Sequence, residues 1–391
     1  MAARLAALIV NYDSGAFALA LARGLRAQWR ELRRASDELE VVVVDNASRT
    51  DQSRELAELA REGARVDRSP TNPGYASGMN RALAQTRGAA SDLVLVLNPD
   101  LALFPGALER MLATHAATSR IGALGPRAFL DPARQWRMPP NRLPTRRAQS
   151  LAERAEHDPR LAAGLARERT RHALREWSAS APISVEMLSG ACLLLSRGAI
   201  DAAGGLFDER YPLYYEDTDL FRRLDRAGLS LVLEPRAEIV HHWARSSGIE
   251  QADPEPARRH AIARAAYFER WSEEQQDLGP SPDCETASVP GTQPLGSCES
   301  APEFRFPHAG RWLIEIAMLP GFPLAAGAFV EGSAWRMDER AWEWFYRGVY
   351  FARAVELEQL EARAVWEFHK CGAARTAPLS PNEIKSLHTC P

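Results

Sequence analysis

The chain has 391 residues, of which 46% are hydrophobic and 25% are charged, and its formal net charge is -3. Its length and composition indicate a globular protein with one large domain and a smaller one. Because 48 basic residues are balanced by 51 acidic ones, the protein has no overall positive electrostatic field that would attract nucleic acid. We therefore expect no nucleic-acid partner. The five cysteines form no CxxC pair, which favours reduced thiols and a cytoplasmic protein over a disulfide framework.

Apolar runs alternate with helical patterns through the first part of the chain, which predicts a mostly parallel sheet covered by helices on both faces. Strands are expected at 5–12, 40–46, 65–68 and 92–100. Open sheets of this class bind ligands at the carboxyl ends of their strands. Six polar residues lie at these strand ends: Asn11, Asp13, Asp45, Asn46, Asn98 and Asp100. Any one of them is explained as a helix cap or a turn former. Their repetition at one edge of the sheet favours a ligand site.

The remaining composition predicts three further parts. Between about 131 and 182 the strand pattern lapses into prolines followed by an Arg- and Ala-rich helical pattern, which indicates an insertion in a domain spanning 1–275. Pro, Ser, Gly and Thr dominate 276–303, which predicts a flexible linker. Aromatic segments in 304–391 predict a β-rich accessory domain of unknown role, whose tryptophans pack in its core. The most apolar run, 313–330, contains an acid and two prolines and predicts two strands around a turn, so we expect no transmembrane segment.

The stretch YYEDTDLFRRLDRAG, 214–228, places Glu216, Asp217 and Asp219 within four positions at the start of an amphipathic helix. One acid suffices to cap a helix, and three so close repel one another and raise the proton affinity of a base among them. Asp100 follows Asn98 with one residue between, a spacing at which two side chains approach one cation together. A histidine pair, His241–His242, ends another strand.

Seven segments resemble, in order and spacing, the family 2 glycosyltransferases of the GT-A fold, especially the branch with bacterial rhamnosyltransferases. They are IVNYDSG, VVVVDNAS, NPGYASGMNRAL, LVLNPD, MLSGACLLLSR, GGLFDERYPLYYEDTDLFRRLDRAG and VHHWARSSG. The resemblance covers about 4–270 and implies an α/β GT-A fold. It also implies inverting transfer of a sugar from a nucleotide-diphosphate donor to a hydroxyl of a glycan, lipid-linked or other acceptor, in polysaccharide biosynthesis.

The resemblance also implies roles for single residues. Asp217 matches the general base, Glu216 its catalytic neighbour, and Gly190 and Asp219 support the acceptor side. Asp100 and His241 match the ligands of a divalent metal, Mg²⁺ or Mn²⁺, with His242 as the alternative histidine. Asn98 stands where many members carry an acid. The donor nucleotide is matched by Val10, Asn11, Tyr12, Asp45, Asn72, Gly74, Asn80 and Asn98.

Two other functions stay open at this point. Asn98 favours a catalytically inactive GT-A scaffold or glycan-binding protein, whereas the intact YYED stretch favours an enzyme. A sugar-phosphate nucleotidyltransferase is less favoured, because 10–20 lacks a Gly-rich basic loop for a triphosphate. We expect a cytoplasmic protein, with peripheral contact at the inner face of the membrane and the oligomeric state left open.

Overall fold

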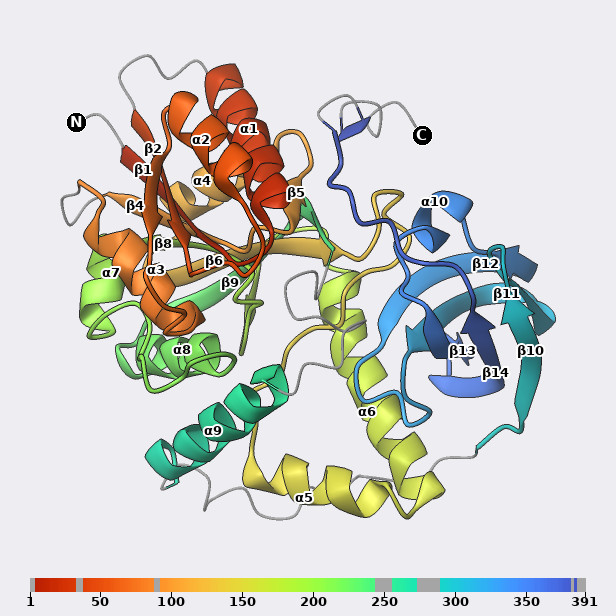
Figure 1. Ribbon diagram of the computed structural model, residues 1–391. Helices are drawn as coiled ribbons and strands as arrows, with labels where there is room; N and C mark the ends of the chain where they lie inside the picture. The colour runs from red at the N-terminus through yellow and green to blue at the C-terminus, as the bar shows by residue number, and fades with distance from the viewer. Residues whose placement is uncertain are drawn as a thin grey trace.

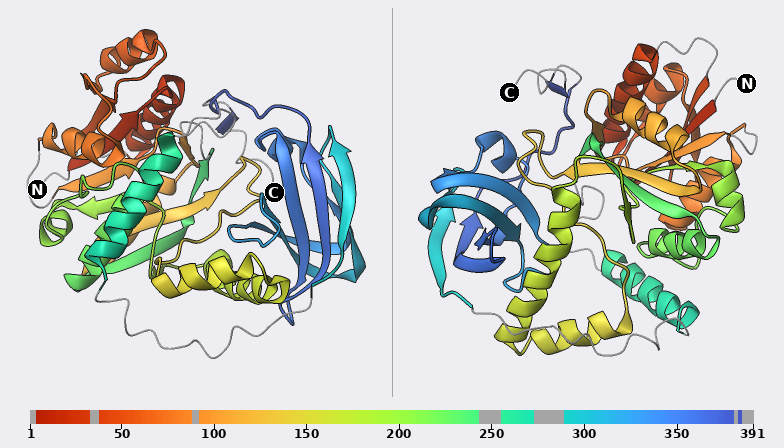
Figure 2. Two further views of the ribbon diagram at one scale, coloured as in Figure 1. Left: turned by 60° about the horizontal axis from the view of Figure 1, so that its bottom comes forward. Right: turned by 180° about the vertical axis from the view of Figure 1, so that it is seen from behind.

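A computed structural model describes residues 4–32, 38–87, 92–242, 255–272, 289–380 and 383–384. Figure 1 shows two β-sheets, with the long helix α6 (Pro159–Trp177) between them. Both views in Figure 2 keep α6 in that position. In the described part of the chain, no helix has the length and apolar character needed to cross a membrane.

The first sheet begins with four parallel strands in the order β3-β2-β1-β4, and continues with β8-β6-β9-β5. β8 is antiparallel to both β4 and β6, β6 and β9 are parallel, and the short β7 pairs with β9. The bounds are β1 (Arg4–Asn11), β2 (Glu38–Asp45), β3 (Arg65–Arg68), β4 (Leu93–Leu97), β5 (Leu101–Leu103), β6 (Ile121–Phe129), β7 (Ile183–Val185), β8 (Cys192–Ser196) and β9 (Ser230–His241).

Helices cover both faces of this sheet, because its strands are apolar on both sides. Alternate residues of β1 enter two separate cores: Leu5, Ala7 and Ile9 pack in one, and Ala6, Leu8 and Val10 in the other. Burying a Leu or Ile side chain contributes roughly 1.5–3 kcal/mol. The first core includes α1 (Gly15–Glu31), α2 (Ser53–Arg61) and α4 (Ala107–Ala117), and the second includes α3 (Tyr75–Ala84), α7 (Arg197–Ala202) and α8 (Glu216–Arg226). The predicted α/β class is confirmed.

The segment LSLVLEPRAEIVHHW suggests a pair of strands, and this expectation is wrong. It forms the single strand β9, whose pairing with β6 shifts between Glu234 and Glu238. The carboxylate of Glu234 accepts a hydrogen bond of 2.9 Å from the backbone N–H of Arg236 across this irregularity. A bulge therefore replaces the expected turn and lets β9 continue to His241.

The insertion is helical, as its pattern predicts. It contains α5 (Arg146–Ala155) and α6, and each begins at a side-chain cap. The hydroxyl of Thr145 accepts a hydrogen bond from the N–H of Ala148, and Asp158 accepts from the N–H groups of Arg160 and Leu161. The helix α9 (Glu255–Arg270) follows the first sheet and packs through Tyr267 and Phe268.

The second sheet has the order β10-β14-β13-β11-β12. Its bounds are β10 (Thr292–Cys298), β11 (Glu303–Ala317), β12 (Ala326–Arg336), β13 (Gly348–Glu356) and β14 (Glu361–Lys370), with the short helix α10 (Glu339–Trp342). The antiparallel pair β11–β12 confirms the two strands expected in 313–330.

The linker expected at 276–303 needs a correction at its carboxyl end. Residues 292–298 form β10, which pairs in parallel with β14, whereas 276–288 lie outside the described residues. β10 lies at the edge of the sheet, and its side chains are almost all exposed. An edge strand held by backbone hydrogen bonds needs few apolar side chains, so its composition resembles that of a linker.

Side chains from the insertion enter the core of the second sheet. Trp136 is fully buried and lies edge-on to Trp335 and Phe345, with ring centroids 5.6 and 6.0 Å apart. Arg137 and Gly327 exchange two backbone hydrogen bonds, of 2.9 and 3.0 Å. The insertion and the second sheet are therefore packed as one unit. The core role predicted for the tryptophans is confirmed for Trp312, Trp342, Trp344 and Trp366, all of which are buried.

Candidate active site

Asn11 and Asp45 lie side by side at the carboxyl ends of β1 and β2. Oδ1 of Asp45 accepts hydrogen bonds from Nδ2 of Asn11 at 2.7 Å and from the hydroxyl of Ser48 at 2.6 Å. Oδ1 of Asn11 accepts from the N–H and hydroxyl of Ser14, so the Asn11 amide is engaged within the protein. Asn11 therefore holds Asp45 in place, and Asp45 is the residue of this pair that can bind a ligand.

Tyr12 and Asp13 form the rim next to Asp45. The guanidinium carbon of Arg49 lies 5.4 Å from the centre of the Tyr12 ring. Asp13 accepts hydrogen bonds of 2.8 Å from the backbone N–H and the hydroxyl of Thr50. Burial opposes ionisation of Asp13, but the bonds from Thr50 and Arg49 outweigh it and lower its pKa. Sequence reasoning missed Arg49 and Thr50, although both follow Asp45 within the segment VVVVDNASRT.

The NPGYASGMN segment contacts the rest of the site mainly through its backbone. A Cβ on Gly74 would lie 2.3 Å from the carbonyl oxygen of Pro212, and the φ of Gly74 is +109°, so only glycine fits. Likewise, a Cβ on Gly78 would lie 2.9 Å from the Val10 side chain, which is buried. Close packing thus explains both glycines and Val10.

Asn72 and Asn80 use their amides inside the protein. Oδ1 of Asn72 accepts from the N–H of Gly74 at 3.1 Å and from Arg259 at 3.2 Å. Asn80 donates to the carbonyl of Phe207 at 2.8 Å and accepts from its N–H at 3.1 Å. These bonds attach α3 to the loop before α8 and to α9. The Asn72 amide also accepts a hydrogen bond of 3.3 Å from Nδ2 of Asn46, at the carboxyl end of β2, whereas the Asn80 amide is engaged with Phe207.

Asp100 lies against His241, because Leu101 and His241 are partners in the β5–β9 pairing. Oδ1 of Asp100 is 3.5 Å from Nε2 of His241. Burial opposes ionisation of Asp100, but the two neighbouring imidazoles outweigh it and the pKa of Asp100 lies below its ordinary value. His242 instead stacks on Trp344, with centroids 3.9 Å apart. This geometry favours His241 over His242 as the partner of Asp100; Ala244 and Ser246 lie outside the described residues.

Asp100 and His241 together could supply only part of the ligand shell of a metal ion. Within the described ranges, no group of three or more His, Cys, Asp or Glu side chains could hold a metal ion. Nδ1 of His241 is buried and has no hydrogen-bond partner among the described residues. One carboxylate and one imidazole suit a cation that takes its other ligands from substrate phosphates and water, as Mg²⁺ commonly does. The two side chains therefore fit a metal shared with a substrate better than a closed structural site.

Asp217 is held by the turn that precedes β8. Its Oδ2 accepts a hydrogen bond of 3.1 Å from the N–H of Gly190, and its Oδ1 accepts one of 2.6 Å from the N–H of Thr218. A Cβ on Gly190 would lie 2.6 Å from Oδ2 of Asp217, so only glycine allows this contact. Tyr214 and Tyr215 precede the acids with φ values of 66° and 68°, a left-handed conformation that is strained in residues other than glycine.

Glu216 differs from Asp217 in its hydrogen bonds. It is 7% exposed, and its Oε2 is buried without a partner among the described residues. Burial raises the pKa of Glu216 well above its usual range, and the charge of Asp217 adds to the effect. Burial also raises the pKa of Asp217, against the opposing bonds from Thr218 and Gly190. Because Asp217 has hydrogen bonds that favour its ionised form and the buried Oε2 of Glu216 has none among the described residues, the pair holds a proton more readily on Glu216.

Tyr75 lies near both groups of acids in the site, Glu216 and Asp217 on α8 and Asp100 in the β4–β5 turn. Its hydroxyl donates a hydrogen bond of 2.8 Å to Oδ1 of Asn98. Burial raises the pKa of Tyr75 well above its usual range, and the charges of Glu216, Asp217 and Asp100 act in the same direction. The phenol therefore lies among the carboxylates of both α8 and the β4–β5 turn. Tyr75 was missed by sequence reasoning, because its ring fits the apolar pattern of α3.

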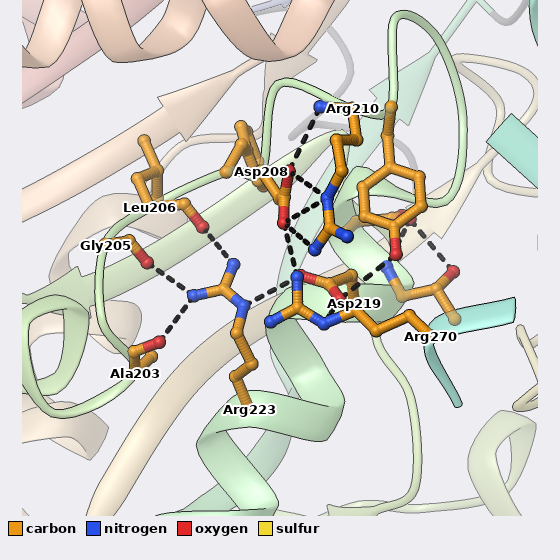
Figure 3. A network of polar contacts seen from close by, with 12 residues as sticks. Ala203, Gly205, Leu206, Asp208, Arg210, Asp219, Arg223 and Arg270 are labelled. Atoms are coloured by element: carbon orange, nitrogen blue, oxygen red, sulfur yellow. Dashed lines mark hydrogen bonds and ion pairs between the residues drawn. The ribbon is translucent and has the colours of Figure 1, made fainter. Parts of the chain in front are cut away.

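Asp219 points into a different environment, which Figure 3 shows. This fully buried carboxylate accepts hydrogen bonds of 2.7 Å from Arg223 and 3.0 Å from the Trp271 indole, and it lies 3.2 Å from Nε of Arg270. Arg223 in turn donates to the carbonyls of Ala203, Gly205 and Leu206. Asp219 therefore ties α8 to α9 and to the loop before α8. It does not cap α8, which begins at Tyr215 without a side-chain cap, so the capping explanation is wrong.

Comparison with known proteins agrees with this geometry. The model of Glycosyl transferase family 2 matches residues 7–179. The chain is 34% identical over 223 residues, 54% of this chain and 69% of the relative, to an N-acetylglucosaminyl-diphospho-decaprenol L-rhamnosyltransferase of Mycobacterium tuberculosis.

Two solved structures are similar in outline. A mannosyltransferase from Pyrobaculum calidifontis, in complex with GDP-Man and Mn²⁺, has a TM-score of 0.41 at 16% identity, covering 72% of this chain and 77% of that one. GalNAc-T7 with UDP, GalNAc and Mn²⁺ has a TM-score of 0.43 at 11% identity; the match covers 69% of this chain and a little over half, 57%, of that one.

The layered α/β sheet with acids at its carboxyl edge defines the class as a glycosyltransferase of the GT-A fold. The similarity to the rhamnosyltransferase then shows the family: the chain belongs to glycosyltransferase family 2.

Proposed function

We propose that the protein transfers a sugar, with inversion, from a nucleotide-diphosphate donor to a hydroxyl of an acceptor. The observation that carries this proposal is the position of Asp217, whose carboxylate is held by the N–H groups of Gly190 and Thr218. Asp100, next to His241, lies close enough to the Tyr75 phenol for its charge, like that of Asp217, to raise the pKa of Tyr75. A base and a group able to hold a cation, both near one phenol, suit displacement at an anomeric carbon.

The donor nucleotide belongs at the edge formed by β1 and β2. Oδ1 of Asp45 is occupied by Asn11 and Ser48, so its other oxygen is the acceptor for N–H groups of a base. The Tyr12 ring and the Arg49 guanidinium offer a flat surface beside it. Asn72, Gly74 and Asn80 support this edge through the contacts of α3.

The reaction is a single displacement. Asp217 accepts the proton of an acceptor hydroxyl while that oxygen forms a bond to the anomeric carbon, and the bond from this carbon to the diphosphate oxygen breaks. The nucleoside diphosphate leaves on the opposite face, so the configuration inverts. Glu216, kept neutral by its burial, avoids a second negative charge beside Asp217. Asp100 and His241 would hold Mg²⁺ or Mn²⁺, whose charge stabilises the departing diphosphate when bound.

We propose a lipid-linked saccharide as the acceptor class. The mycobacterial relative is named for a saccharide on a diphospho-decaprenol, and this supports a lipid-linked acceptor. A catalytically inactive GT-A scaffold is the second candidate. Asn98 favours it, because an amide bonded to Tyr75 stands two residues before Asp100, where a second carboxylate would strengthen cation binding.

A measurement of donor turnover distinguishes the glycosyltransferase from the inactive scaffold. Purified protein is incubated with a panel of nucleotide sugars that includes activated rhamnose, with and without Mn²⁺, and nucleoside diphosphate release is measured. Release by the wild type, lost by a factor of about 10²–10⁴ in Asp217→Asn while donor Kd stays within twofold, supports the proposal. Binding of donors without release by the wild type supports the scaffold.

A further inference from the structure

A cavity of about 220 Å³ lies between the insertion and the second sheet. One wall consists of 139–142 and of α6 from Arg169 to Ala173, and the other consists of Glu315 and the β11–β12 connection from Phe322 to Ala325. Nothing in the proposed reaction uses this cavity. Its volume is below the roughly 300–1,000 Å³ of sites that enclose a drug-sized ligand, so it holds a single ring and not a nucleotide sugar.

The walls of the cavity are both apolar and polar. Pro139, Pro140, Pro323 and Leu324 supply flat or aliphatic surface, and Leu324 is 56% exposed. Donors and acceptors come from Asn141, Arg142, Arg169, His172 and Glu315. A sugar ring has C–H faces and a hydroxyl edge, and this mixture of surfaces suits it.

Two charged groups of the wall, Arg142 and Glu315, already have partners of opposite charge, which disfavours a free phosphate as the ligand. Arg142 lies 3.0 Å from Glu168 and 3.7 Å from Glu186. Glu315, which is buried, lies 2.6 Å from Arg353. An anion would have to compete with these carboxylates for the cations, whereas hydroxyl groups accept and donate bonds without displacing them. A neutral polyhydroxyl ligand therefore fits better.

The cavity is rigid. The hydroxyl of Thr170 donates to Glu315 at 2.9 Å and accepts from Arg353 at 2.8 Å, which joins α6 to β11 and β13. Arg353 also donates to the carbonyl of Ala166 on α6, at 3.2 Å. These groups are buried, so the network fixes the second sheet against the insertion. The two walls are consequently held apart at a constant spacing.

The cavity is connected to the catalytic turn. Asn141 lines it and donates a hydrogen bond of 3.0 Å to the carbonyl of Leu188. Two residues after Leu188, the N–H of Gly190 holds Asp217. The wall of the cavity is therefore joined by a hydrogen bond to the segment 188–190, which positions Asp217.

We propose that this cavity is an acceptor subsite, which binds a neutral sugar residue of a glycan acceptor next to the one that receives the transferred sugar. The inference rests on the proposed function, because the ligand is the acceptor of that reaction. It also gives the second sheet a role: the sheet selects acceptors that carry at least two sugar residues.

Two exposed leucines of the same β11–β12 connection allow a matched test. Leu324 lines the cavity, whereas Leu319, 59% exposed, does not. Leu324→Trp fills the cavity mouth, and Leu319→Trp adds the same indole outside it. The full chain, without donor, is applied to a glycan array of mono- to tetrasaccharides, and the Kd of the best-bound glycan is then measured in solution for each variant.

We expect the Kd of a glycan with two or more residues to rise at least tenfold in Leu324→Trp and to stay within twofold in Leu319→Trp. Equal losses in both variants would show that the connection contacts a lipid surface or another partner, and would overturn the inference. So would unchanged binding in Leu324→Trp or a wild type that binds no glycan. Donor turnover is measured separately: turnover without cavity binding refutes only the subsite, and cavity binding without any turnover refutes only the proposed transfer.

Discussion

Gly190 and Asp217 are 27 residues apart in the chain, and the N–H of Gly190 donates a 3.1 Å hydrogen bond to Oδ2 of Asp217. The contact requires a residue without a side chain at 190, because a Cβ there would lie 2.6 Å from that oxygen. The turn before β8 thereby sets the position of the proposed base on α8. In the proposed mechanism this short segment therefore controls the position of the proton acceptor.

Gly190→Ala should lower kcat about 100-fold, because the added methyl group displaces the carboxylate of Asp217 from its hydrogen-bonded position. The measurement is steady-state transfer with the donor and acceptor found by screening. Gly24→Ala is the control, since nothing lies within 4 Å of a Cβ at that position in α1. A Gly190→Ala enzyme with wild-type kcat would show that Asp217 need not be held by this turn.

Glu216 and Asp217 should differ in the pH profile of kcat. Asp217 must be ionised to accept a proton, so activity falls as the pH drops through its raised pKa. Glu216→Gln should retain this acid limb and lose less than tenfold in kcat, because glutamine resembles the neutral acid. Asp217→Asn should lose about 10²–10⁴-fold at every pH. The reverse order of losses would assign the base to Glu216.

Glu216→Gln should also stabilise the fold at neutral and alkaline pH. Because burial and the charge of Asp217 raise the pKa of Glu216, the folded chain binds this proton more tightly than the unfolded chain does. The free energy of unfolding is therefore highest below the unfolded pKa of about 4.3 and falls as the pH rises through the folded one. At pH 8 we expect Glu216→Gln to be more stable by about 1–3 kcal/mol in urea titrations, and at pH 4 to match the wild type. A destabilised variant at pH 8 would mean that the carboxylate has a partner.

Asn98→Asp should strengthen metal dependence. The substitution places a second carboxylate two residues before Asp100 and next to the Tyr75 hydroxyl, which now donates to Oδ1 of Asn98. More negative charge beside Asp100 favours a divalent cation, so the Mn²⁺ concentration for half-maximal activity should fall several-fold. Tyr75→Phe in the same background separates the charge from the hydrogen bond. An unchanged Mn²⁺ dependence would place the cation elsewhere.

Asp219→Asn should act on stability and not on chemistry. The change leaves Arg223 and Arg270 without their shared carboxylate in a buried network, which costs about 3–5 kcal/mol of unfolding free energy. Asp225→Asn on the exposed side of α8 is the matched control and should stay within about 0.5 kcal/mol. If Asp219→Asn kept wild-type stability but lost acceptor binding, Asp219 would belong to the ligand site.

The α/β sheet was predictable from the sequence, because doubly buried strands such as EVVVVDN and DLVLVLNPD are distinctive, whereas the GT-A class was implied by the resemblance of seven ordered segments to family 2 glycosyltransferases. The bulged β9 and the edge strand β10 were not. A bulge depends on register with β6, and an edge strand held by backbone hydrogen bonds has the composition of a linker.

The elements that carry the candidate acids were more predictable than the hydrogen bonds of the amides. The pattern placed Asp100, Asp217 and His241 in the right elements, but it did not reveal that Asn11 and Asn80 are bonded within the protein. Nor did it reveal that Asp219 faces Arg223 and Trp271, since residues two apart on a helix point in different directions. Tyr75 was hidden because an aromatic residue in a helical stripe is typical of a core.

The most direct test of the account is a crystal structure of the chain with a nucleoside diphosphate and Mn²⁺. We predict that the cation is bound by the Asp100 carboxylate and Nε2 of His241, and that the terminal phosphate faces Asp217 across the Tyr75 hydroxyl. A cation bound away from both side chains, or a phosphate on the far side of the sheet from Asp217, would contradict it.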